Sequence, residues 1–281
     1  MRVKIISDST CDLSAELIKK HDIGIVPLIV MKDGQEFLDG VTINPSDIFA
    51  HVDSGGDLCS TAARGVSVYQ EKFAQYAKDY DGVIHINIGS DFSSSFQNAC
   101  IAAADFDKVR VVDSKNLSTG QGLVVLKACE LAQTVKDMDE LKAQLDAFTS
   151  RVESSFVIDR LAYMVKGGRC SGAAALGANL LSLKPCIEVK DGKMVVVKKY
   201  RGHFEKCMVS YVKDRLTDRD DLDNGTVFIT HTDVSPESLE VVRGAVAEAG
   251  HFKAVYETVA GCTVSCHCGP GTMGILFVRK S

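Results

Sequence analysis

Short runs of β-branched residues alternate with amphipathic stretches through the first half of the chain, and this alternation limits the possible folds more than any other feature. The runs predict strands at residues 3–7, 25–30, 83–88 and 109–112. Each run is short, apolar and bounded by polar residues, which is typical of strands buried on both faces. Strands and helices in alternation predict a parallel, Rossmann-like α/β sheet with helices on both faces.

The amphipathic stretches predict helices. Asn44 and Pro45 supply an N-cap and a first-turn proline for a helix that runs through Val52. Ser67 begins a second helix. An apolar stripe marks a third, at Phe96, Ala99, Cys100 and Ala103, and residues 122–134 and 139–152 supply two more.

The second half of the chain follows a different pattern. After predicted helices at residues 159–166 and 171–181, the runs 185–190 and 194–200 flank Asp191-Gly192, a strong hairpin signal. Further strands are predicted at 227–232, 254–259 and 274–278, with a helix begun by Ser235-Pro236. We therefore expect two domains, an α/β domain over residues 1–154 and an α+β domain over residues 155–281.

Composition narrows the class of protein. The chain has 281 residues, 46% of them apolar and 25% charged, as an ordinary globular protein has. No window holds 18 uninterrupted apolar residues, and the N-terminal segment reads as a first strand rather than a signal peptide, so we expect a cytoplasmic protein without a membrane segment. The net charge of −5 argues against nucleic acid as a partner.

Ten cysteines are scattered along the chain without a CxxC pair, and we interpret them as small buried apolar residues that the cytosol keeps reduced. One cluster, Cys262, Cys266, His267 and Cys268, suggests a metal. If this stretch is a strand, His267 faces away from Cys266 and Cys268, so the three cannot close on one ion. We predict no metal and no other cofactor.

Hydroxyl-rich segments follow three of the predicted strands, at residues 7–10, 89–95 and 113–120. Ligands of such sheets bind beyond the carboxyl ends of the strands, and hydroxyls with free helix amides suit a carboxylate or phosphate. The same residue types also cap helices, and a cap or turn role is favoured for Asp8 and Asp113. The serines of residues 90–95 exceed what a cap needs, which leaves the two interpretations of that segment evenly balanced.

Known enzyme signatures are incomplete in this sequence. Metal-dependent phosphatases carry an aspartyl nucleophile just beyond a first strand, where this chain has Asp8. Their second carboxylate lies two residues further on, where this chain has Thr10. The sequence lacks the GxSxG motif of hydrolases and the GxxxxGK[ST] loop that binds nucleotide phosphates. Gly120 begins a pattern similar to a dinucleotide-binding motif, but Val125 stands at the position of its third glycine.

Several motifs together resemble the DegV family over essentially the whole chain. These are ISDSTCDLS from Ile6, the pair Ser60-Thr61, DFSSSFQNA from Asp91, VVDSKNLSTGQG from Val111, KGGRC from Lys166 and HCGPG from His267. The resemblance implies a two-domain protein that holds one long-chain fatty acid in a tunnel and has no catalytic activity alone. It also implies a partner, the ATP-binding subunit of a fatty acid kinase, which phosphorylates the presented carboxylate to an acyl phosphate for phospholipid synthesis.

The resemblance also implies roles for single residues. Thr61 and Ser93 match the hydroxyls that hold the carboxylate, with Ser60 and Ser94 beside them, and His267 matches a histidine near it. Arg169 and Arg201 match arginines of partner contact and phosphoryl transfer, and we expect both at the rim. The sequence departs from the family pattern at Ala62, Ala63, Arg64, Ser94, Ser95 and Cys170.

The hydrocarbon tail of a fatty acid needs a tunnel with apolar walls. The small residues of 171–181 are a candidate for part of that wall, although tight helix packing explains them equally well. Two other functions stay open on the residues alone. A hydroxyl-lined cleft with His267 and two arginines could process phosphate esters unaided, or a short pocket could sense a small anion.

Overall fold

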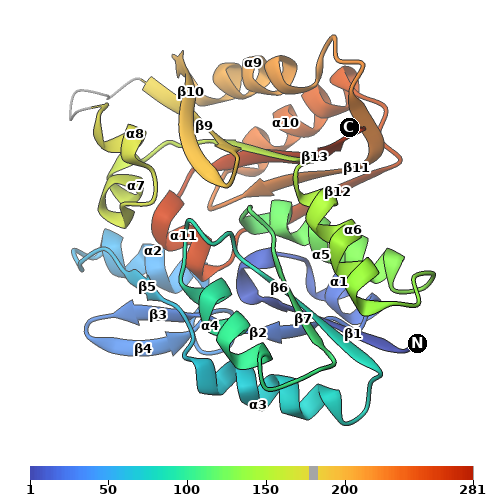
Figure 1. The fold of residues 1–281 in the computed structure, drawn as a ribbon. Helices are drawn as coiled ribbons and strands as arrows, with labels where there is room; N and C mark the ends of the chain where they lie inside the picture. The colour runs from blue at the N-terminus through green and yellow to red at the C-terminus, as the bar shows by residue number, and fades with distance from the viewer. Residues whose placement is uncertain (177–182, 281) are drawn as a thin grey trace.

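The structure is a computed structural model that describes residues 1–176 and 183–280. Its N-terminal half contains a parallel four-stranded sheet in the order β2-β1-β6-β7 (Figure 1). These strands are β1 (Val3–Asp8), β2 (Gly24–Val26), β6 (Gly82–Asn87) and β7 (Val109–Asp113). The parallel sheet predicted from the alternation of strands and helices is confirmed.

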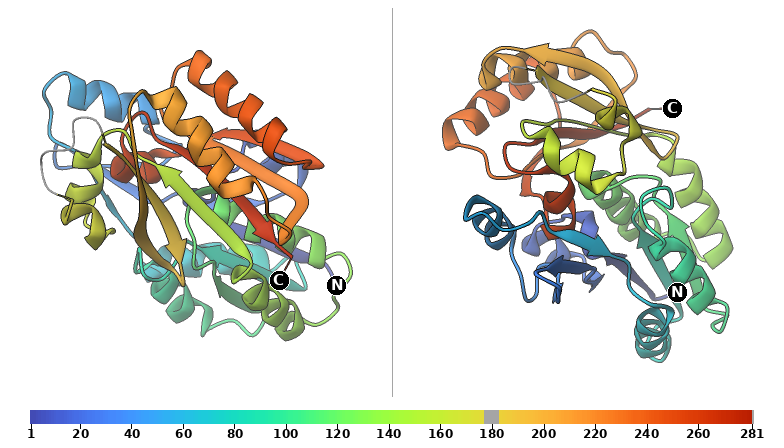
Figure 2. Two further views of the ribbon diagram at one scale, coloured as in Figure 1. Left: turned by 90° about the horizontal axis from the view of Figure 1, so that it is seen from above. Right: turned by 90° about the vertical axis from the view of Figure 1, so that its left-hand side faces the viewer.

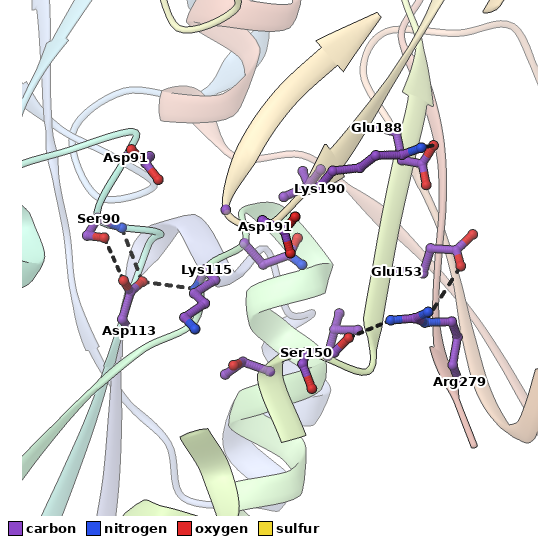
Figure 3. Close-up of a pocket in the computed structure, with 15 residues that line it drawn as sticks. Ser90, Asp91, Asp113, Lys115, Ser150, Glu153, Glu188, Lys190, Asp191 and Arg279 are labelled. Atoms are coloured by element: carbon purple, nitrogen blue, oxygen red, sulfur yellow. Dashed lines mark hydrogen bonds and ion pairs between the residues drawn. The ribbon is translucent and has the colours of Figure 1, made fainter. Parts of the chain in front are cut away.

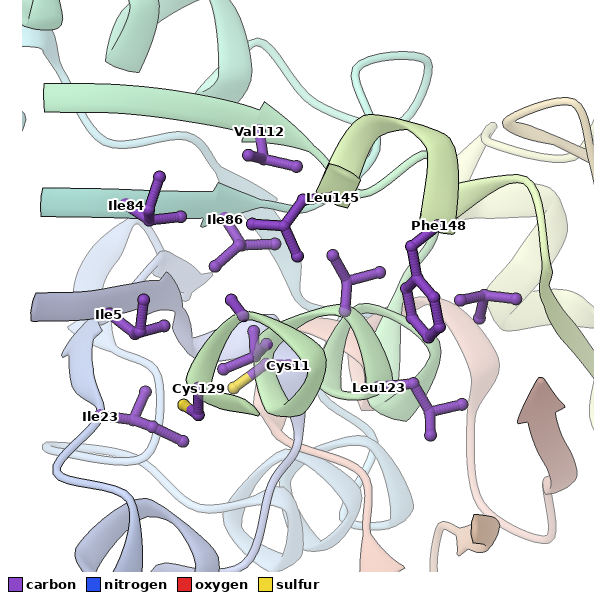
Figure 4. Packing of buried hydrophobic residues seen from close by; sticks show 14 of the residues in the cluster. Ile5, Cys11, Ile23, Ile84, Ile86, Val112, Leu123, Cys129, Leu145 and Phe148 are labelled. Atoms are coloured by element: carbon purple, nitrogen blue, oxygen red, sulfur yellow. The ribbon is translucent and has the colours of Figure 1, made fainter. Parts of the chain in front are cut away.

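Helices cover both faces of this sheet, because each strand is apolar on both sides. Ile5 packs in one buried cluster with helices α1 (Ala15–Lys20), α5 (Ser118–Leu131) and α6 (Met138–Thr149), shown in Figure 4. Its neighbour Ile6 packs on the other side with α3 (Val66–Ala77) and α4 (Ser95–Ala103). Alternate residues of a strand point to opposite faces, so β1 contributes to two cores at once.

A six-stranded mixed sheet, in the order β10-β9-β8-β13-β11-β12, dominates the C-terminal half. Its strands are β8 (Val152–Val157), β9 (Leu183–Lys190), β10 (Lys193–Arg201), β11 (Leu222–His231), β12 (Ala254–Val259) and β13 (Met273–Arg279). Helices α9 (Phe204–Leu216) and α10 (Pro236–Ala249) pack on one face (Figure 2). The predicted hairpin is confirmed, since Asp191 and Gly192 have the positive φ angles, 49° and 78°, of a tight two-residue turn.

Helix α5 joins the two halves. Its residues 118–125 are all buried, and its cluster takes in the first sheet together with Phe228 and Leu276 of the second. The boundary predicted between residues 154 and 155 falls inside β8, whereas residues 150 and 151 precede that strand. The division into two domains stays a prediction.

One predicted strand is wrong. Residues 25–30 are split at Pro27 between β2 and β3 (Ile29–Lys32), which belongs to a third sheet with β4 (Gln35–Leu38) and β5 (Ser60–Ala62). Proline has no N–H for a ladder, and the next amide, that of Leu28, donates to Ser9 Oγ at 3.1 Å instead. Ser60 and Thr61 therefore lie on a short strand beside the main sheet.

Residues 262–268 form helix α11 (Cys262–Cys268), so treating this stretch as a strand was wrong. Helix α11 lies between the six-stranded and three-stranded sheets and packs against α2 (Pro45–Asp53) and α7 (Leu161–Gly167) (Figure 1). Over residues 1–176 and 183–280, no group of three His, Cys, Asp or Glu side chains is placed to hold a metal.

Other expected elements differ at their ends or were missed. The helix predicted over 139–152 stops at Thr149, ahead of β8, which begins at Val152, and α9 was not predicted. Helix α8 covers Ser171–Ala174, whereas the rest of the predicted small-residue helix, from residue 177 on, lies outside the described residues. None of the described helices has the length and apolar content to cross a bilayer.

Candidate functional site

A cavity of about 290 Å³ opens where the carboxyl end of β6, strand β5, helix α11 and the β9–β10 hairpin meet. Its polar lining comes from Thr61, Ser93, Ser94, Thr263, Arg169 and His267. The remaining lining is Leu28, Ala62, Ala63, Ile88, Phe92, Leu117, Met194, Val264 and Cys268. Hydroxyls and apolar side chains thus share one cavity near the end of a parallel strand, where ligands of α/β sheets bind.

Thr61 and His267 meet across this cavity from opposite ends of the chain. Thr61 Oγ1 lies 2.8 Å from His267 Nε2, which joins β5 to α11. Burial, and secondarily the positive charge of Arg169, lowers the pKa of His267 to about 4. The imidazole is therefore neutral near pH 7, and the pair offers hydrogen bonds without a fixed charge.

Two aspartate side chains of the N-terminal half hold the start of α11. Asp39 accepts hydrogen bonds from the amide of Cys262 at 2.8 Å and the hydroxyl of Thr263 at 2.7 Å. Asp12 accepts one from the amide of Gly261 at 2.9 Å, and its burial raises its pKa to about 8. Helix N-termini favour such acceptors, so these contacts fix the helix that carries His267.

Gly167, the first glycine of the KGGRC motif, packs directly against the histidine ring. A Cβ at this position would lie 2.2 Å from His267 Nδ1, far inside contact distance. Only glycine lets α7 approach α11 this closely. The first glycine of the motif is therefore explained by helix packing, independently of the arginine that follows it.

The serine-rich loop between β6 and α4 divides between two surfaces. Ser93 and Ser94 line the cavity, and Ser93 Oγ accepts a hydrogen bond from the Ser95 amide at 3.2 Å. Ser90 faces away, with its hydroxyl donating to Asp113 Oδ2 at 2.6 Å. Only part of the loop is thus available to a ligand in this cavity.

Asp8 serves the framework and does not line the cavity. Its buried carboxylate accepts hydrogen bonds from the Tyr69 hydroxyl at 3.0 Å, the Asn87 side-chain amide at 3.0 Å and the Ile88 backbone amide at 3.1 Å. These contacts fix the end of β6 just before the serine loop. Asp113, at the end of β7, accepts hydrogen bonds from the amides of Ser90 and Lys115 and so fixes the start of that loop.

The structure separates the two predicted arginines. Arg169 is exposed at the mouth of the cavity, where its guanidinium donates to the Gly167 carbonyl at 2.6 Å. Arg201 is exposed at the end of β10 and is not part of the lining. Ser60 is also exposed and outside the lining, because it neighbours Thr61 on a strand and so points the other way.

A second, much smaller hollow adjoins the cavity. Its volume is about 20 Å³, its exposed surface is almost wholly apolar, and it shares three lining residues with the cavity, Leu117, Val264 and Cys268. Phe156 and Leu276, from β8 and β13, also line it, and we call the two hollows together the apolar path. Sequence reasoning missed these residues and Met194. Strands β8 and β13 are buried at almost every position, so no alternation of buried and exposed residues marks those that face the hollow.

A larger hollow of about 450 Å³ is lined in part by Ser90 and Asp91 of the serine loop (Figure 3). Charged side chains line it, among them Asp91, Lys115, Glu153, Glu188 and Arg279. Placing hydrocarbon there would strip water from these charges without replacing it, which costs free energy. Its size alone therefore does not make it the site for an apolar ligand.

The cavity beside Thr61 has a different electrostatic character. Its described lining contains no aspartate or glutamate, and Arg169 is the cation at its mouth. Neutral hydroxyls and a nearby positive charge favour an anionic head group, while the apolar side chains of the same cavity suit hydrocarbon. This arrangement suits an amphipathic acid.

Comparison with known proteins agrees with the fold and motifs. The model of the family described as "Uncharacterised protein, DegV family" matches residues 2–280. The chain belongs to the DegV family. A DegV domain-containing protein of Clostridium acetobutylicum is 33% identical to this DegV-family chain over 283 residues, which covers 99% of each protein.

Two solved structures are similar over nearly the full length. A DegV-family protein of Thermus thermophilus, described as binding fatty acid, has a TM-score of 0.89 and 26% identity, and the match covers 99% of this chain and 100% of that one. A stearic acid-binding protein of Eubacterium ventriosum has a TM-score of 0.86 and 27% identity over 99% of this chain and 98% of that one. The expected DegV fold is thereby confirmed.

Proposed function

We propose that this protein binds one long-chain fatty acid, with the carboxylate at Thr61, Ser93, Ser94 and His267 and the tail along the apolar path. One observation carries the proposal: a hydroxyl-lined mouth free of acidic side chains in the described lining leads into an apolar interior. The fatty acids bound by the two similar proteins support the same ligand class.

The energies of the two ends of the ligand fit this placement. Each buried methylene contributes about 0.8 kcal/mol, so ten of them contribute about 8 kcal/mol. Burying the carboxylate opposes binding unless hydrogen bonds replace its water. Thr61 on β5 and Ser93 on the loop after β6 supply such donors, and neutral His267 adds a further group without binding the carboxylate as tightly as an ion pair.

The position of Arg169 supports a role in presenting the carboxylate to a partner. An exposed guanidinium at the mouth can offset the charge that develops on a phosphoryl group during transfer. We infer that an ATP-binding kinase subunit docks here in the cytoplasm, contacts Arg169 and Arg201, and converts the carboxylate to an acyl phosphate for phospholipid synthesis. In this proposal, the protein alone has no catalytic activity.

Native mass spectrometry of protein purified from cells tests the proposal, followed by extraction of the bound compound. One fatty acid per chain, released on denaturation, is the expected result. Empty protein that hydrolyses phosphate esters on its own would instead identify a stand-alone enzyme. A bound small anion without a tail would identify an anion sensor.

Phosphorylation by the partner is tested separately with ATP, the kinase subunit and hydroxylamine, which traps acyl phosphate as a hydroxamate. Arg169→Ala should retain its lipid yet yield little hydroxamate, since the arginine lies at the mouth and not along the tail. Unchanged hydroxamate formation in this variant would remove the proposed role of Arg169.

A further inference from the structure

Ser95 contacts one of the proposed carboxylate-binding residues, Ser93, although it does not itself line the cavity. It is the first residue of α4 and is fully buried. Its backbone amide donates to Ser93 Oγ at 3.2 Å, and its own hydroxyl oxygen lies 3.0 Å from the same atom. One buried neighbour therefore holds the Ser93 hydroxyl through two hydrogen bonds.

Two other serines of the same loop are placed differently. The Ser94 side chain is exposed, and it accepts no capping hydrogen bond from the described residues of α4. Ser90 is also exposed, and its hydroxyl donates to Asp113 Oδ2 at 2.6 Å. Ser95 thus combines full burial with contact to a hydroxyl that faces the cavity.

We propose that Ser95 is a positioning residue that makes Ser93 an obligatory hydrogen-bond donor and so gives the cavity a preference for a carboxylate over an uncharged lipid head group. A hydroxyl oxygen can accept two hydrogen bonds, and the hydroxyl can donate one. The Ser95 amide fills one acceptor position of Ser93, and the Ser95 hydroxyl fills the other when a ligand takes the Ser93 proton. Ser93 then has only its proton to offer.

A carboxylate matches such a donor better than an alcohol does. An ionised carboxylate only accepts hydrogen bonds, and its charge makes each of them stronger than a bond between neutral groups. The chain from Ser95 through Ser93 to the ligand adds to this strength, because each hydrogen bond polarises the next. An alcohol has no charge and also carries a proton that Ser93 cannot accept. The inference rests on the proposed function, since it takes a fatty acid carboxylate as the ligand of Ser93.

A purely structural role for Ser95 predicts a different result. Serine also occurs at the start of helices, where its side chain and amide stabilise the first turn. Loss of that stabilisation would displace Ser93 and weaken every ligand of the cavity alike. A positioning role affects only the head groups that accept a hydrogen bond from Ser93, so two lipids with the same tail separate the two roles.

Binding of oleate and of oleyl alcohol to the full chain, measured by displacement of a fluorescent fatty acid, tests the proposal. Ser95→Ala should weaken oleate binding about five- to tenfold and leave oleyl alcohol within about twofold of the wild type. Ser95→Thr keeps the hydroxyl, so its oleate affinity should stay within about threefold. Ser90→Ala is the matched control from the same loop, and it should leave the ratio of the two affinities unchanged.

Equal losses for the two lipids in Ser95→Ala, or an unchanged affinity for oleate, would overturn the proposal. If Ser95→Ala fails to fold, Ser95→Cys provides the same comparison, because a thiol is a much weaker donor than a hydroxyl.

A measurement without lipid tests the Ser93–Ser95 pair itself. Urea unfolding of the lipid-free wild type, Ser93→Ala, Ser95→Ala and the double variant forms a double-mutant cycle. The double variant should be less destabilised than the two single effects combined, by a factor of about three or more in the unfolding equilibrium constant. Additive effects would overturn the proposal. Coupling in a protein that binds neither lipid would refute the proposed function, whereas coupling with equal losses for both lipids would refute only the role of Ser95.

Discussion

Among single residues, Thr61 and Ser93 carry most of the proposed head-group specificity through their hydroxyls. Thr61→Val combined with Ser93→Ala removes both and leaves the apolar path intact. A hydrogen bond to a charged group contributes about 1.5–3 kcal/mol, so each loss should weaken fatty acid binding by about 10- to 100-fold. Competition with a fluorescent fatty acid measures the change.

Ser60→Ala is the matched control for this pair. Ser60 adjoins Thr61 but is exposed and outside the cavity lining, so its loss should leave affinity within about twofold. If Ser60→Ala weakens binding as much as the double variant does, the carboxylate lies on the other face of β5.

His267 should also affect how the free energy of unfolding depends on pH. Its pKa falls from 6.5 when unfolded to about 4 when folded, so between these values the unfolded chain binds more protons. Stability of the lipid-free protein should therefore fall as pH drops from 6.5 to 4, with about 3 kcal/mol contributed by this residue. Urea unfolding at several pH values measures the slope.

His267→Gln removes this titration and should flatten the slope relative to wild type over the same window. Contributions from other groups, including Asp12, cancel in the difference between the two proteins. Identical slopes for the variant and the wild type would show that His267 is not held in its neutral form by burial.

At the scale of elements, the approach of α7 to α11 decides where His267 lies. Gly167→Ala places a methyl group 2.2 Å from His267 Nδ1, so α11 or the ring must move. The shift should break the contact with Thr61 and lower both fatty acid retention and thermal stability. Thermal unfolding and native mass spectrometry report the two effects.

Gly244→Ala provides the comparison on an exposed face of α10, where an added Cβ meets nothing within 4 Å. Alanine favours a helix interior over glycine, so this variant should gain about 0.5–1 kcal/mol and keep its lipid. Equal losses from both substitutions would contradict a specific role for Gly167.

Local sequence patterns determine some elements of this fold and not others. The parallel strands and the Asp191-Gly192 hairpin were predictable because periodicity and turn chemistry act over a few residues. Helix α11 was not, since its short run of cysteine, threonine and valine lacks a helical stripe. Its N-terminus is fixed by Asp12 and Asp39, which lie 249 and 223 residues away from the amides they hold.

The candidate site was likewise predictable only in part. The residues matching the family motifs include Thr61, Ser93 and His267, which the fold gathers around one cavity. Ser60 and Arg201 match motifs too, but the pleat of β5 and the end of β10 turn them toward solvent. Which side of a short strand faces a cavity depends on the neighbouring sheet, and that information is not local.

In the molecule as a whole, the proposed path of the fatty acid tail lies between the two halves of the chain, past the three residues that its two hollows share. Val264→Phe adds bulk where the path narrows. It should weaken binding of long-chain acids while sparing short ones, because overpacking affects only ligands that reach this point. A series of fatty acids of increasing length measures the cut-off.

Val255→Phe serves as the control, since Val255 is 50% exposed on the edge strand β12 and lines neither hollow. A uniform loss of affinity across all chain lengths in Val264→Phe would place the tail elsewhere.

One crystal structure would show directly where the two ends of the fatty acid lie. With a fatty acid brominated at its terminal carbon, anomalous diffraction locates the tail without assumptions. We predict carboxylate oxygens within hydrogen-bond distance of Thr61 and Ser93, and bromine beyond Val264 toward Phe156 and Leu276. Bromine in the charged hollow beside Asp91 and Arg279, or in solvent, would contradict it.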